Sequence, residues 1–347
     1  MKTLTILGTR PELIRLSLII PKLDKFCNHI LVDTQQNYDY NMSGIFYKEL
    51  GIRVPDYALG VRGSFGDQIA AIMQSMEVIL RAEKPDKVLV LGDTNSSLGA
   101  IMAKRMGIPV YHMEAGNRAF SDVLPEEVNR RLIDHSSDVL MPYTERSRQN
   151  LLREGIPSER IFVTGNPIRE VMKHFQKDVH QCTDNAFKYL MVTLHRSETV
   201  DNKERLHNVI SALQALSGRY AVILSTHPHT AAKLKYFLID TAGIDCVEPF
   251  GFFEFMAYER DAQCVLTDSG TVQEETCILK VPNVILRDVT ERPETLECGS
   301  GILAGTDPDN IVRAVDVAIS TPCNWEPPLE YMRTNVSDTV VKILLGS

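Results

Sequence analysis

The sequence has little of what a membrane protein or a nucleic-acid-binding protein needs. None of its 347 residues lie in an apolar run that approaches the ~20 residues of a membrane-spanning helix. Positive charge is in deficit: 37 Lys and Arg face 45 Asp and Glu, and the net charge of −8 opposes binding to duplex DNA or to an anionic membrane. Met1–Thr3 leads directly into an apolar stretch, so we expect no signal peptide. We therefore expect a cytoplasmic protein with neither a nucleic acid nor a membrane as its partner.

Metal and cofactor motifs are absent as well. The seven cysteines form no C-x-x-C pair and show no metal-binding spacing. Several lie within apolar runs, as Cys246 and Cys264 do, so we expect buried, reduced thiols. Neither G-x-G-x-x-G nor a Walker A sequence occurs. The sequence therefore predicts no bound metal and no cofactor.

What the sequence does have is an alternation of short apolar runs with helix-length amphipathic segments. Leu4–Gly8, Lys87–Gly92 and Tyr189–Thr193 are near-continuous apolar stretches, which are typical of buried parallel strands. Pro11–Phe26 is predicted as one helix after the first of them. This alternation predicts an α/β fold in which helices cover both faces of parallel sheets.

A turn at Gly165–Pro167 separates two such series. We expect two Rossmann-like doubly wound domains that face each other across a cleft, residues 1–166 and residues 167–328. Ligands of this architecture bind at the carboxyl ends of the strands, so the cleft is the expected binding site.

The first polar cluster, Gly8–Glu12, follows the first predicted strand. Thr9 and Glu12 fit a capping box, and Pro11 suits a first helical turn. Helix capping does not explain Arg10, because a cation at a helix N-terminus is unfavourable unless an anion binds there. A phosphate group would resolve this conflict.

Three carboxylates stand at comparable places further along the first half. Asp93 follows a predicted strand, Glu114 ends another, and Glu126 opens a helix. Asp93 and Glu126 also have a simpler explanation, since acidic residues stabilise helix N-termini. If the three share one rim, they raise one another's pKa values, which suits acid–base chemistry.

The second half supplies cations and small residues instead. His195 and His227 follow predicted strands, and Ser269–Gly270 precedes a helix. Backbone N–H groups at such a helix N-terminus can hold phosphate oxygens, although Thr271 and Glu274 also fit a simple capping box. The pattern predicts a phosphorylated ligand bound between a wall of carboxylates and a wall of cations.

Taken in order, these motifs resemble those of the non-hydrolysing UDP-N-acetylglucosamine 2-epimerases. The matching segments span nearly the whole chain and are Gly8–Glu12, Gly92–Thr94, His112–Gly116, Pro125–Arg130, Thr164–Asn166, Asp268–Glu275 and Arg287–Glu294. The resemblance implies an isomerase of GT-B architecture that forms a homodimer. It also implies that a C-terminal helix, within residues 329–347, returns to the first domain.

The resemblance implies a reaction on a UDP-N-acetylhexosamine. A carboxylate removes the C2 proton while UDP leaves C1, which gives a 2-acetamidoglucal held beside UDP. A proton then returns to the opposite face and UDP re-adds. The catalytic residues that the resemblance implies are Asp93, Glu114, Glu126 and His227.

A further set is implied to bind the substrate. Glu274 would bind the ribose diol, Phe255 would stack near uracil, and Arg130 would lie beside the carboxylates. The whole set consists of Arg10, Arg15, Arg118, Arg130, His195, Phe255, Ser269, Gly270, Glu274 and Arg292.

Departures from the family pattern bear on the sugar. Arg15 replaces a usual Lys, Asn117 interrupts the usual Gly-Leu-Arg, and Thr34–Tyr40 replaces a Gln-His-rich segment. The variants Asn37–Tyr40 and Asn117–Arg118 favour the branch that converts UDP-2-acetamido-2,6-dideoxy-L-talose to UDP-N-acetyl-L-fucosamine for capsule or O-antigen synthesis. The alternative substrate pair is UDP-GlcNAc and UDP-ManNAc.

Other classes of function stay open on the sequence. A GT-B glycosyltransferase would share the fold and the nucleotide pocket, but it would need an acceptor. A hydrolysing epimerase would release UDP, and a non-catalytic nucleotide-sugar-binding protein would need no carboxylates.

Overall fold

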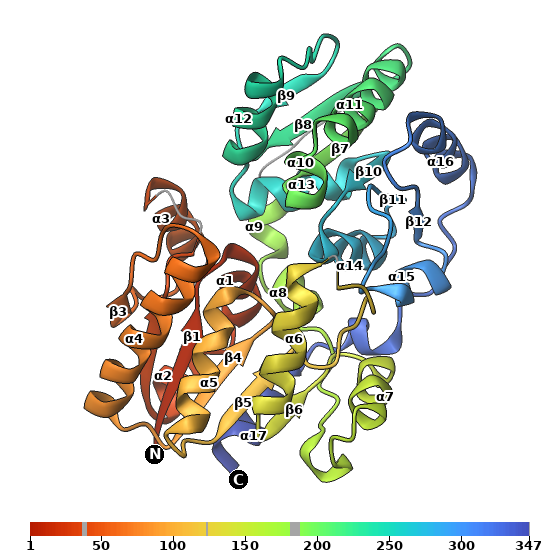
Figure 1. The fold of residues 1–347 in the computed structure, drawn as a ribbon. Helices are drawn as coiled ribbons and strands as arrows, with labels where there is room; N and C mark the ends of the chain where they lie inside the picture. Colours follow the sequence, from red (N-terminus) through yellow and green to blue (C-terminus); the bar gives the residue numbers. More distant parts are fainter. Residues whose placement is uncertain (37–39, 123, 181–187, 347) are drawn as a thin grey trace. The chain divides into compact units, whose positions relative to one another are not determined.

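The computed structural model describes residues 1–36, 40–122, 124–180 and 188–346, and the chain divides into two compact units (Figure 1). The first unit comprises Met1–His174 and Leu329–Ser347, and the second comprises Phe175–Pro328. The sequence predicts the boundary at residue 166, but helix α8 (Ile168–His174) packs on α1 (Arg10–Leu16) in the first unit. The boundary therefore follows His174.

The first unit is built on a parallel sheet with the strand order β3-β2-β1-β4-β5-β6. Its strands are β1 (Lys2–Leu7), β2 (Asn28–Asp33), β3 (Tyr57–Ala58), β4 (Lys87–Leu91), β5 (Val110–Met113) and β6 (Val139–Met141). The chain starts in the middle and winds first to one edge, then to the other. The loops after β1 and β4 therefore lie side by side at the carboxyl edge, where this class of sheet binds ligands.

Helices cover both faces of this sheet (Figure 1). Besides α1 and α8 they are α2 (Ile20–Phe26), α3 (Tyr40–Glu49), α4 (Phe65–Glu83), α5 (Gly99–Arg105), α6 (Pro125–Ser136), α7 (Glu145–Arg153) and α17 (Val336–Gly346). The prediction of one helix over Pro11–Phe26 is wrong, because the helix breaks between Leu16 and Ile20. Pro21 explains the break: it has no N–H group, and its ring would clash with the carbonyl of Ser17 in a continuous helix.

The C-terminal helix α17 belongs to the first unit and packs on α2. Lys87 Nζ donates a hydrogen bond to the Leu344 carbonyl at 2.7 Å. At the other end of the helix, Glu170 accepts hydrogen bonds from the backbone N–H and the hydroxyl of Ser337 at 2.8 and 2.5 Å.

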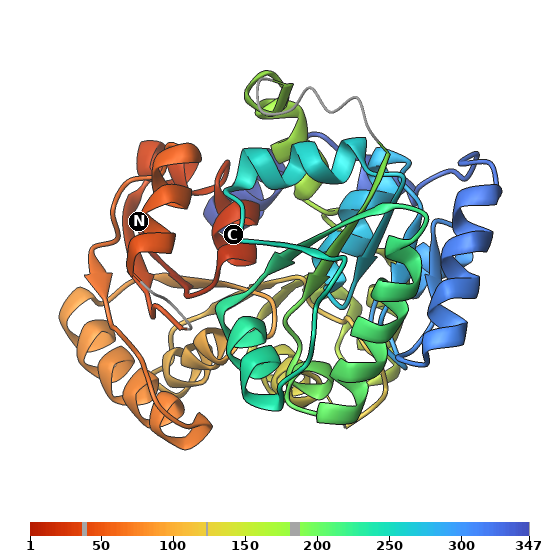
Figure 2. The same cartoon turned by 90° about the horizontal axis from the view of Figure 1, so that it is seen from above.

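The second unit has a parallel sheet of the same kind, with the order β12-β11-β10-β7-β8-β9. Its strands are β7 (Tyr189–Leu194), β8 (Ala221–Thr226), β9 (Asp245–Val247), β10 (Cys264–Thr267), β11 (Asn283–Ile285) and β12 (Gly301–Leu303). Here the winding reverses between β7 and β10. Figure 2 shows α11 (Lys203–Ser217) and α16 (Pro308–Ser320) packed together on one face.

The other helices of this unit are α9 (Gln176–His180), α10 (Ser197–Val200), α12 (Pro228–Phe237), α13 (Phe252–Asp261), α14 (Gly270–Leu279) and α15 (Pro293–Glu297). Together the two units confirm the prediction of doubly wound α/β architecture. In the described residues, no helix has the length and apolarity to cross a membrane.

Apolar runs mark the central strands but not three of the four edge strands. The central strands β1, β4, β7 and β10 are almost entirely buried. The strands β3, β9 and β12 are edge strands of two or three residues, too short and too exposed for a run of apolar residues to mark them. Beyond β6, Ile161 forms an isolated bridge with Leu140.

Gly116, in the loop after β5, offers a test of this packing. Its φ is 79°, and a Cβ atom there would lie 2.3 Å from the Ser147 carbonyl oxygen and 2.8 Å from Leu151 Cγ. We expect Gly116→Ala to lower the free energy of unfolding by about 3 kcal/mol or more, because it adds a clash with backbone to left-handed strain. Denaturant unfolding followed by circular dichroism measures the loss.

Gly107→Ala is the matched control. Gly107 has a φ of 77°, and nothing lies within 4 Å of its Cβ position. This variant should lose only about 1–2 kcal/mol, the cost of the left-handed conformation alone. Equal losses for the two variants would contradict the close packing at Gly116.

Candidate functional site

In the first unit, the loops after β1 and β4 are joined by the side chain of Glu12. Its Oε2 accepts hydrogen bonds from the N–H groups of Gly8 and Thr9 at 2.6 and 3.0 Å, and its Oε1 lies 2.5 Å from Thr94 Oγ1. Burial raises the pKa of Glu12 to about 8; these hydrogen bonds oppose the rise, and the charge of Asp93 adds to it. The sequence pattern predicts Glu12 only as part of a helix-capping box, and its contact with Thr94 becomes visible in the structure.

Asp93 and Arg130 are brought together by helix α6. Arg130 Nη2 lies 2.6 Å from Asp93 Oδ2, and Asn129 on the same helix donates a hydrogen bond to the Asp93 carbonyl at 2.9 Å. The same guanidinium holds Glu127 on its own helix, with Nη1 2.8 Å from Oε2. The β4 loop and the N-terminal half of α6 therefore form one assembly.

Glu114 follows β5 in a left-handed conformation, with a φ of 64°. Such a backbone is strained for a residue other than glycine and is common at functional sites. Its Oε2 lies 3.9 Å from where a Cβ of Gly92 would be, so the carboxylate lies against the residue that precedes Asp93. Asn117 Nδ2 donates a hydrogen bond to Oε1 at 3.3 Å, and Asn117 in turn accepts one from Ser147.

The two adjacent glutamates of α6 divide their roles. Glu127 is fully buried and accepts hydrogen bonds from the N–H groups of Ala119 and Phe120 at 3.0 and 3.2 Å. It therefore holds the loop after Glu114 in place. Glu126 lies half-buried in the first turn of the helix that Arg130 ties to Asp93.

Arg118, which the family resemblance places in the substrate-binding set, lies in a network of ion pairs inside the first unit. Its guanidinium forms a two-pronged pair with Glu154 at 2.6 and 2.7 Å and contacts Asp134 at 2.8 Å. Asp134 also accepts from His112 and from the N–H of Gly116. Burial alone would raise the pKa of Asp134, but His112 and Arg118 outweigh it and hold that pKa below its usual range. Arg118 is thus committed to the interior of the unit.

The two remaining arginines of the first unit differ from each other. Arg10 is half-buried at the start of α1, with its guanidinium 5.5 Å from the centre of the Phe46 ring. Arg15 is only 2% exposed and lies in the last turn of α1, where a cation suits the helix dipole. Arg15 therefore lies where the helix dipole favours a cation, whereas Arg10 lies at the N-terminus of the same helix, where the dipole disfavours one.

In the second unit, Asp268 joins the loops after β7 and β10. Its Oδ2 accepts hydrogen bonds from the N–H groups of His195 and Arg196 at 2.9 and 2.8 Å, and its Oδ1 lies 3.2 Å from His195 Nδ1. Protein around the inner side of the ring displaces water and lowers the pKa of His195, against the attraction of Asp268. The centres of the His195 and His227 rings are 6.4 Å apart.

His227 caps helix α12. Its Nδ1 accepts a hydrogen bond from the N–H of His229 at 3.2 Å. The proton of the neutral ring then sits on Nε2, which can donate to an anion.

The start of α14 is shaped by Glu291 and Arg292. A Cβ on Gly270 would lie 2.5 Å from Glu291 Oε1, so only glycine fits beside this carboxylate. Arg287 pairs with Glu291 at 2.9 Å. Arg292 Nε donates a short hydrogen bond to Glu274 Oε1, and its Nη1 lies 3.8 Å from Glu291. Three predicted site residues, Gly270, Glu274 and Arg292, therefore gather here, and the carboxylate of Glu274 is paired with Arg292.

Ser269 and Phe255 complete the predicted set of the second unit. Ser269 is the N-cap residue of α14, and its hydroxyl lies 3.0 Å from that of Thr271. Phe255, on α13, is half-buried and packs on an apolar cluster that includes Val272 of α14. Sequence patterns missed Arg287 and Glu291 as members of this site, because their ion pair becomes visible only in the structure.

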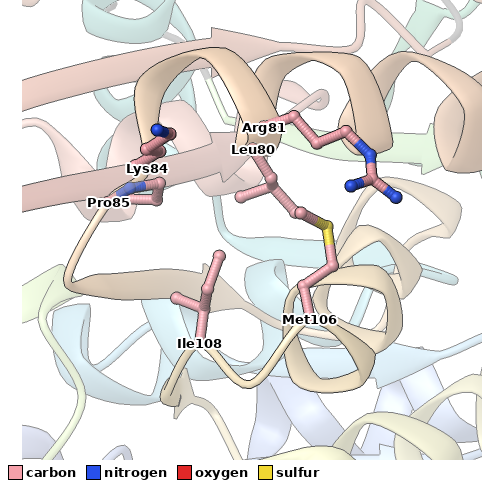
Figure 3. A pocket seen from close by; sticks show the side chains of 6 residues that line it. All are labelled: Leu80, Arg81, Lys84, Pro85, Met106 and Ile108. Atoms are coloured by element: carbon pink, nitrogen blue, oxygen red, sulfur yellow. The ribbon is translucent and has the colours of Figure 1, made fainter.

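Two further features bear on ligands. Across the part of the chain that the structure describes, no group of three or more His, Cys, Asp or Glu side chains could hold a metal ion. A hollow lined by Leu80, Arg81, Lys84, Pro85, Met106 and Ile108 lies on the first unit (Figure 3). These residues precede β4 and β5, so the hollow is at the amino ends of the strands, away from the residues above.

Known proteins resemble the chain along its whole length. The family model for UDP-N-acetylglucosamine 2-epimerase matches residues 22–345. The UDP-N-acetylglucosamine 2-epimerase of Methanocaldococcus jannaschii is 42% identical, with 99% of each chain covered. The UDP-2,3-diacetamido-2,3-dideoxy-D-glucuronate 2-epimerase of Pseudomonas aeruginosa is 34% identical, with 92% of each chain covered.

Solved structures agree. The M. jannaschii UDP-GlcNAc 2-epimerase in complex with UDP-GlcNAc and UDP superimposes with a TM-score of 0.95, at 41% identity and full coverage of both chains. The Neisseria meningitidis UDP-GlcNAc 2-epimerase bound to UDP-GlcNAc gives a TM-score of 0.90, at 30% identity and full coverage of both chains. The protein belongs to the non-hydrolysing UDP-N-acetylglucosamine 2-epimerase family and is an isomerase of GT-B fold.

Proposed function

We propose that this protein inverts C2 of a UDP-N-acetylhexosamine by eliminating UDP and adding it back. In the first step the C2 proton passes to a carboxylate, the C1–oxygen bond to UDP breaks, and a C1=C2 double bond forms. In the second step a proton is delivered to the other face of C2 while a β-phosphate oxygen attacks C1. Family membership and the grouping of Asp93, Glu114 and α6 in one assembly carry the proposal.

The chemistry explains why the acids and the cations are both needed. The C2 proton is weakly acidic because no ketone stabilises the carbanion, so departure of UDP must lead or accompany its removal. Charge then develops on the diphosphate, where preorganised donors contribute most. We assign the donors to Arg10, His227 and the N-terminus of α14 at Ser269–Gly270.

Two acid–base groups are needed, because the proton leaves one face of C2 and arrives on the other. We assign these roles to Asp93, Glu114 and Glu126. Arg130 Nη2 lies 2.6 Å from Asp93 Oδ2 and holds this half-buried carboxyl in place, as the geometry of a base requires. The strained backbone at Glu114 fixes the direction of its carboxylate.

The first substrate to test is UDP-GlcNAc, with UDP-ManNAc as its product. The relatives with 42% and 41% identity carry the names of UDP-GlcNAc enzymes. Of the variants that favour the L-fucosamine branch, Asn117 is explained by its contacts with Glu114 and Ser147. Residues 37–39 of the segment Asn37–Tyr40 lie outside the described residues. The 6-deoxy-L-talose derivative is the second substrate to test, because Arg15 and this segment still depart from the family pattern.

Deuterium exchange tests the reaction. With UDP-GlcNAc alone in D₂O, we expect C2 inversion and deuterium at C2 of both nucleotide sugars, without an acceptor. NMR follows both signals, and the same assay with UDP-2-acetamido-2,6-dideoxy-L-talose identifies the preferred sugar by kcat/KM. Accumulation of free UDP and sugar would support a hydrolysing enzyme instead. Turnover that needs an acceptor would support a glycosyltransferase, and binding without exchange would support a sensor.

Neutral variants of the acids test their roles. Asp93→Asn, Glu114→Gln and Glu126→Gln should each slow C2 exchange by about 100-fold or more, the usual loss for an acid–base group. Affinity for UDP, measured by calorimetry, should change only a few-fold. Glu77→Gln on the exposed face of α4 is the control and should behave as wild type. Normal exchange in any one of the three variants removes that residue from the mechanism.

Glu12→Gln tests the buried carboxyl between the β1 and β4 loops. The pKa of Glu12 is raised from 4.5 to about 8 in the folded protein. At a pH between these two values, Glu12 is ionised in the unfolded chain but protonated in the folded protein. Wild type therefore loses stability as pH rises through this window, with a slope of up to ~1.4 kcal/mol per pH unit.

Gln carries no such proton, and it reproduces the hydrogen bonds of the neutral acid. The stability of Glu12→Gln relative to wild type should therefore rise from pH 5 to pH 8 in urea unfolding. A difference that stays flat, or that falls with pH, would show that Glu12 is charged in the folded protein.

The variant Arg118→Lys tests whether Arg118 has a structural role or a substrate-binding role. Arg118→Lys keeps the charge but loses the two-pronged contact with Glu154, so we expect a loss of about 2–4 kcal/mol in stability. KM for the sugar nucleotide should stay within twofold. Arg81→Lys, in an exposed pair, is the control and should change stability by less than ~1 kcal/mol. A raised KM at unchanged stability would return Arg118 to the binding site.

A further inference from the structure

Two cysteines of the second unit lie in contact although 21 residues separate them in sequence. Cys277 is in the last turns of α14, and Cys298 caps the C-terminal end of α15. Their Sγ atoms are 3.6 Å apart. A disulfide bond needs ~2.05 Å between the sulfur atoms, so the pair must close by about 1.5 Å.

The two thiols differ in exposure and in acidity. Cys277 is buried, whereas Cys298 is partly open to solvent. The hydrogen bond from the Cys277 thiol lowers the pKa of Cys298, with help from Ser300 and from the backbone N–H of Cys298, while Cys277 keeps its proton. This is the arrangement of a reactive thiolate beside a second thiol that can resolve it.

The other described cysteines lack this combination. Cys246 and Cys323 are exposed, which corrects the expectation that the cysteines are generally buried, and Cys264 is buried inside β10. Burial raises the pKa of Cys264 and also that of Cys323. Cys182 lies outside the described residues. Nothing in the proposed epimerisation uses a thiol, so this pair is independent of the proposed function.

We propose that Cys277 and Cys298 form a redox modification site, which a hydroperoxide oxidises to a disulfide in two steps. The Cys298 thiolate attacks one peroxide oxygen, the O–O bond breaks, and the departing alkoxide takes a proton to leave as an alcohol or as water. Cys298 becomes a sulfenic acid. The Cys277 sulfur then attacks the Cys298 sulfur, the S–O bond breaks, and the hydroxide leaves as water with the proton of Cys277. Two thiols lose two electrons, and the peroxide gains them.

Neighbouring groups hold the two cysteines in place. Thr295 and Ser300 lie on either side, with Cys298 Sγ 3.5 Å from the Thr295 carbonyl oxygen and 3.4 Å from Ser300 Oγ. The backbone of Cys277 is held from the other side, because Trp325 Nε1 donates to its carbonyl at 3.1 Å. These contacts hold the two sulfur atoms close to each other.

The bond would close a loop that carries functional residues. The segment between the two cysteines contains β11, Arg287, Glu291 and Arg292. One end of it is already tied to α14 by the ion pair between Arg292 and Glu274. A disulfide would add a second, covalent tie between the helix that starts at Gly270 and the segment that supplies these arginines.

Peptide mapping of the full chain tests the proposal. The reduced protein is treated with one equivalent of hydrogen peroxide, free thiols are alkylated, and tryptic peptides are analysed by mass spectrometry. We expect a cross-link between the peptides of Cys277 and Cys298, a loss of two hydrogen masses, and full reversal by a dithiol. Cys298 should lose its free thiol about tenfold faster or more than Cys246 does.

Variants assign the two roles. In Cys277→Ser no resolving thiol remains, so Cys298 should accumulate as a sulfenic acid that a cyclic diketone probe labels. Cys298→Ser should abolish both the cross-link and the labelling, whereas Cys246→Ser, the matched control, should form the cross-link as wild type does. Circular dichroism verifies that each variant is folded. A cross-link through Cys264 or Cys323, or a Cys298 that oxidises no faster than Cys246, would overturn the proposal.

Discussion

In each unit, a buried carboxyl at the point where the parallel sheet reverses its winding is the contact that holds the predicted site residues of that unit. In the first sheet β1 and β4 are neighbours, and Glu12 takes the N–H groups of the β1 loop while it contacts Thr94 of the β4 loop. In the second sheet β7 and β10 are neighbours, and Asp268 of the β10 loop takes the N–H groups of His195 and Arg196. Glu12 and Asp268 thus have the same structural role. Adjacent loops diverge where the strand order reverses, and each carboxyl holds two such loops in the positions that ligand binding requires.

The two carboxyls lie in different surroundings. Asp268 accepts hydrogen bonds from two backbone N–H groups and lies beside His195. Glu12 accepts hydrogen bonds from two backbone N–H groups and contacts the Thr94 hydroxyl, and burial raises its pKa, which favours its neutral form. The buried Glu12 thus holds the β1 and β4 loops in place, while Asp93, to which we assign an acid–base role, pairs with Arg130 in the β4 loop.

Most of this architecture follows from local sequence, and the exceptions share one cause. Apolar runs predict the central strands. Positions at strand ends or helix starts make Asp93, Glu114 and Glu126 candidate site residues. The ion pairs of Arg118 are not predicted from sequence, because its partners, Asp134 and Glu154, are 16 and 36 residues away (118 to 134 and 118 to 154), beyond any local pattern. The pairing of Arg287 with Glu291 is local, yet only the fold shows that Glu291 lies against Gly270. Residue type predicts chemistry, but only tertiary contacts show whether a charge is already used.

Two of the sequence variants that were used to predict the sugar make structural contacts within the first unit. Asn117 stands next to Arg118, and both were interpreted as departures that report the substrate. In the structure Asn117 bridges Ser147 of α7 to the Glu114 carboxylate, and Arg118 binds α7 to Asp134. A change at these positions therefore alters how α7 supports the β5 loop, whatever the sugar is. A search for the residues that set specificity therefore starts better from Arg10, half-buried at the start of α1, than from Arg118, whose ion pairs support this loop.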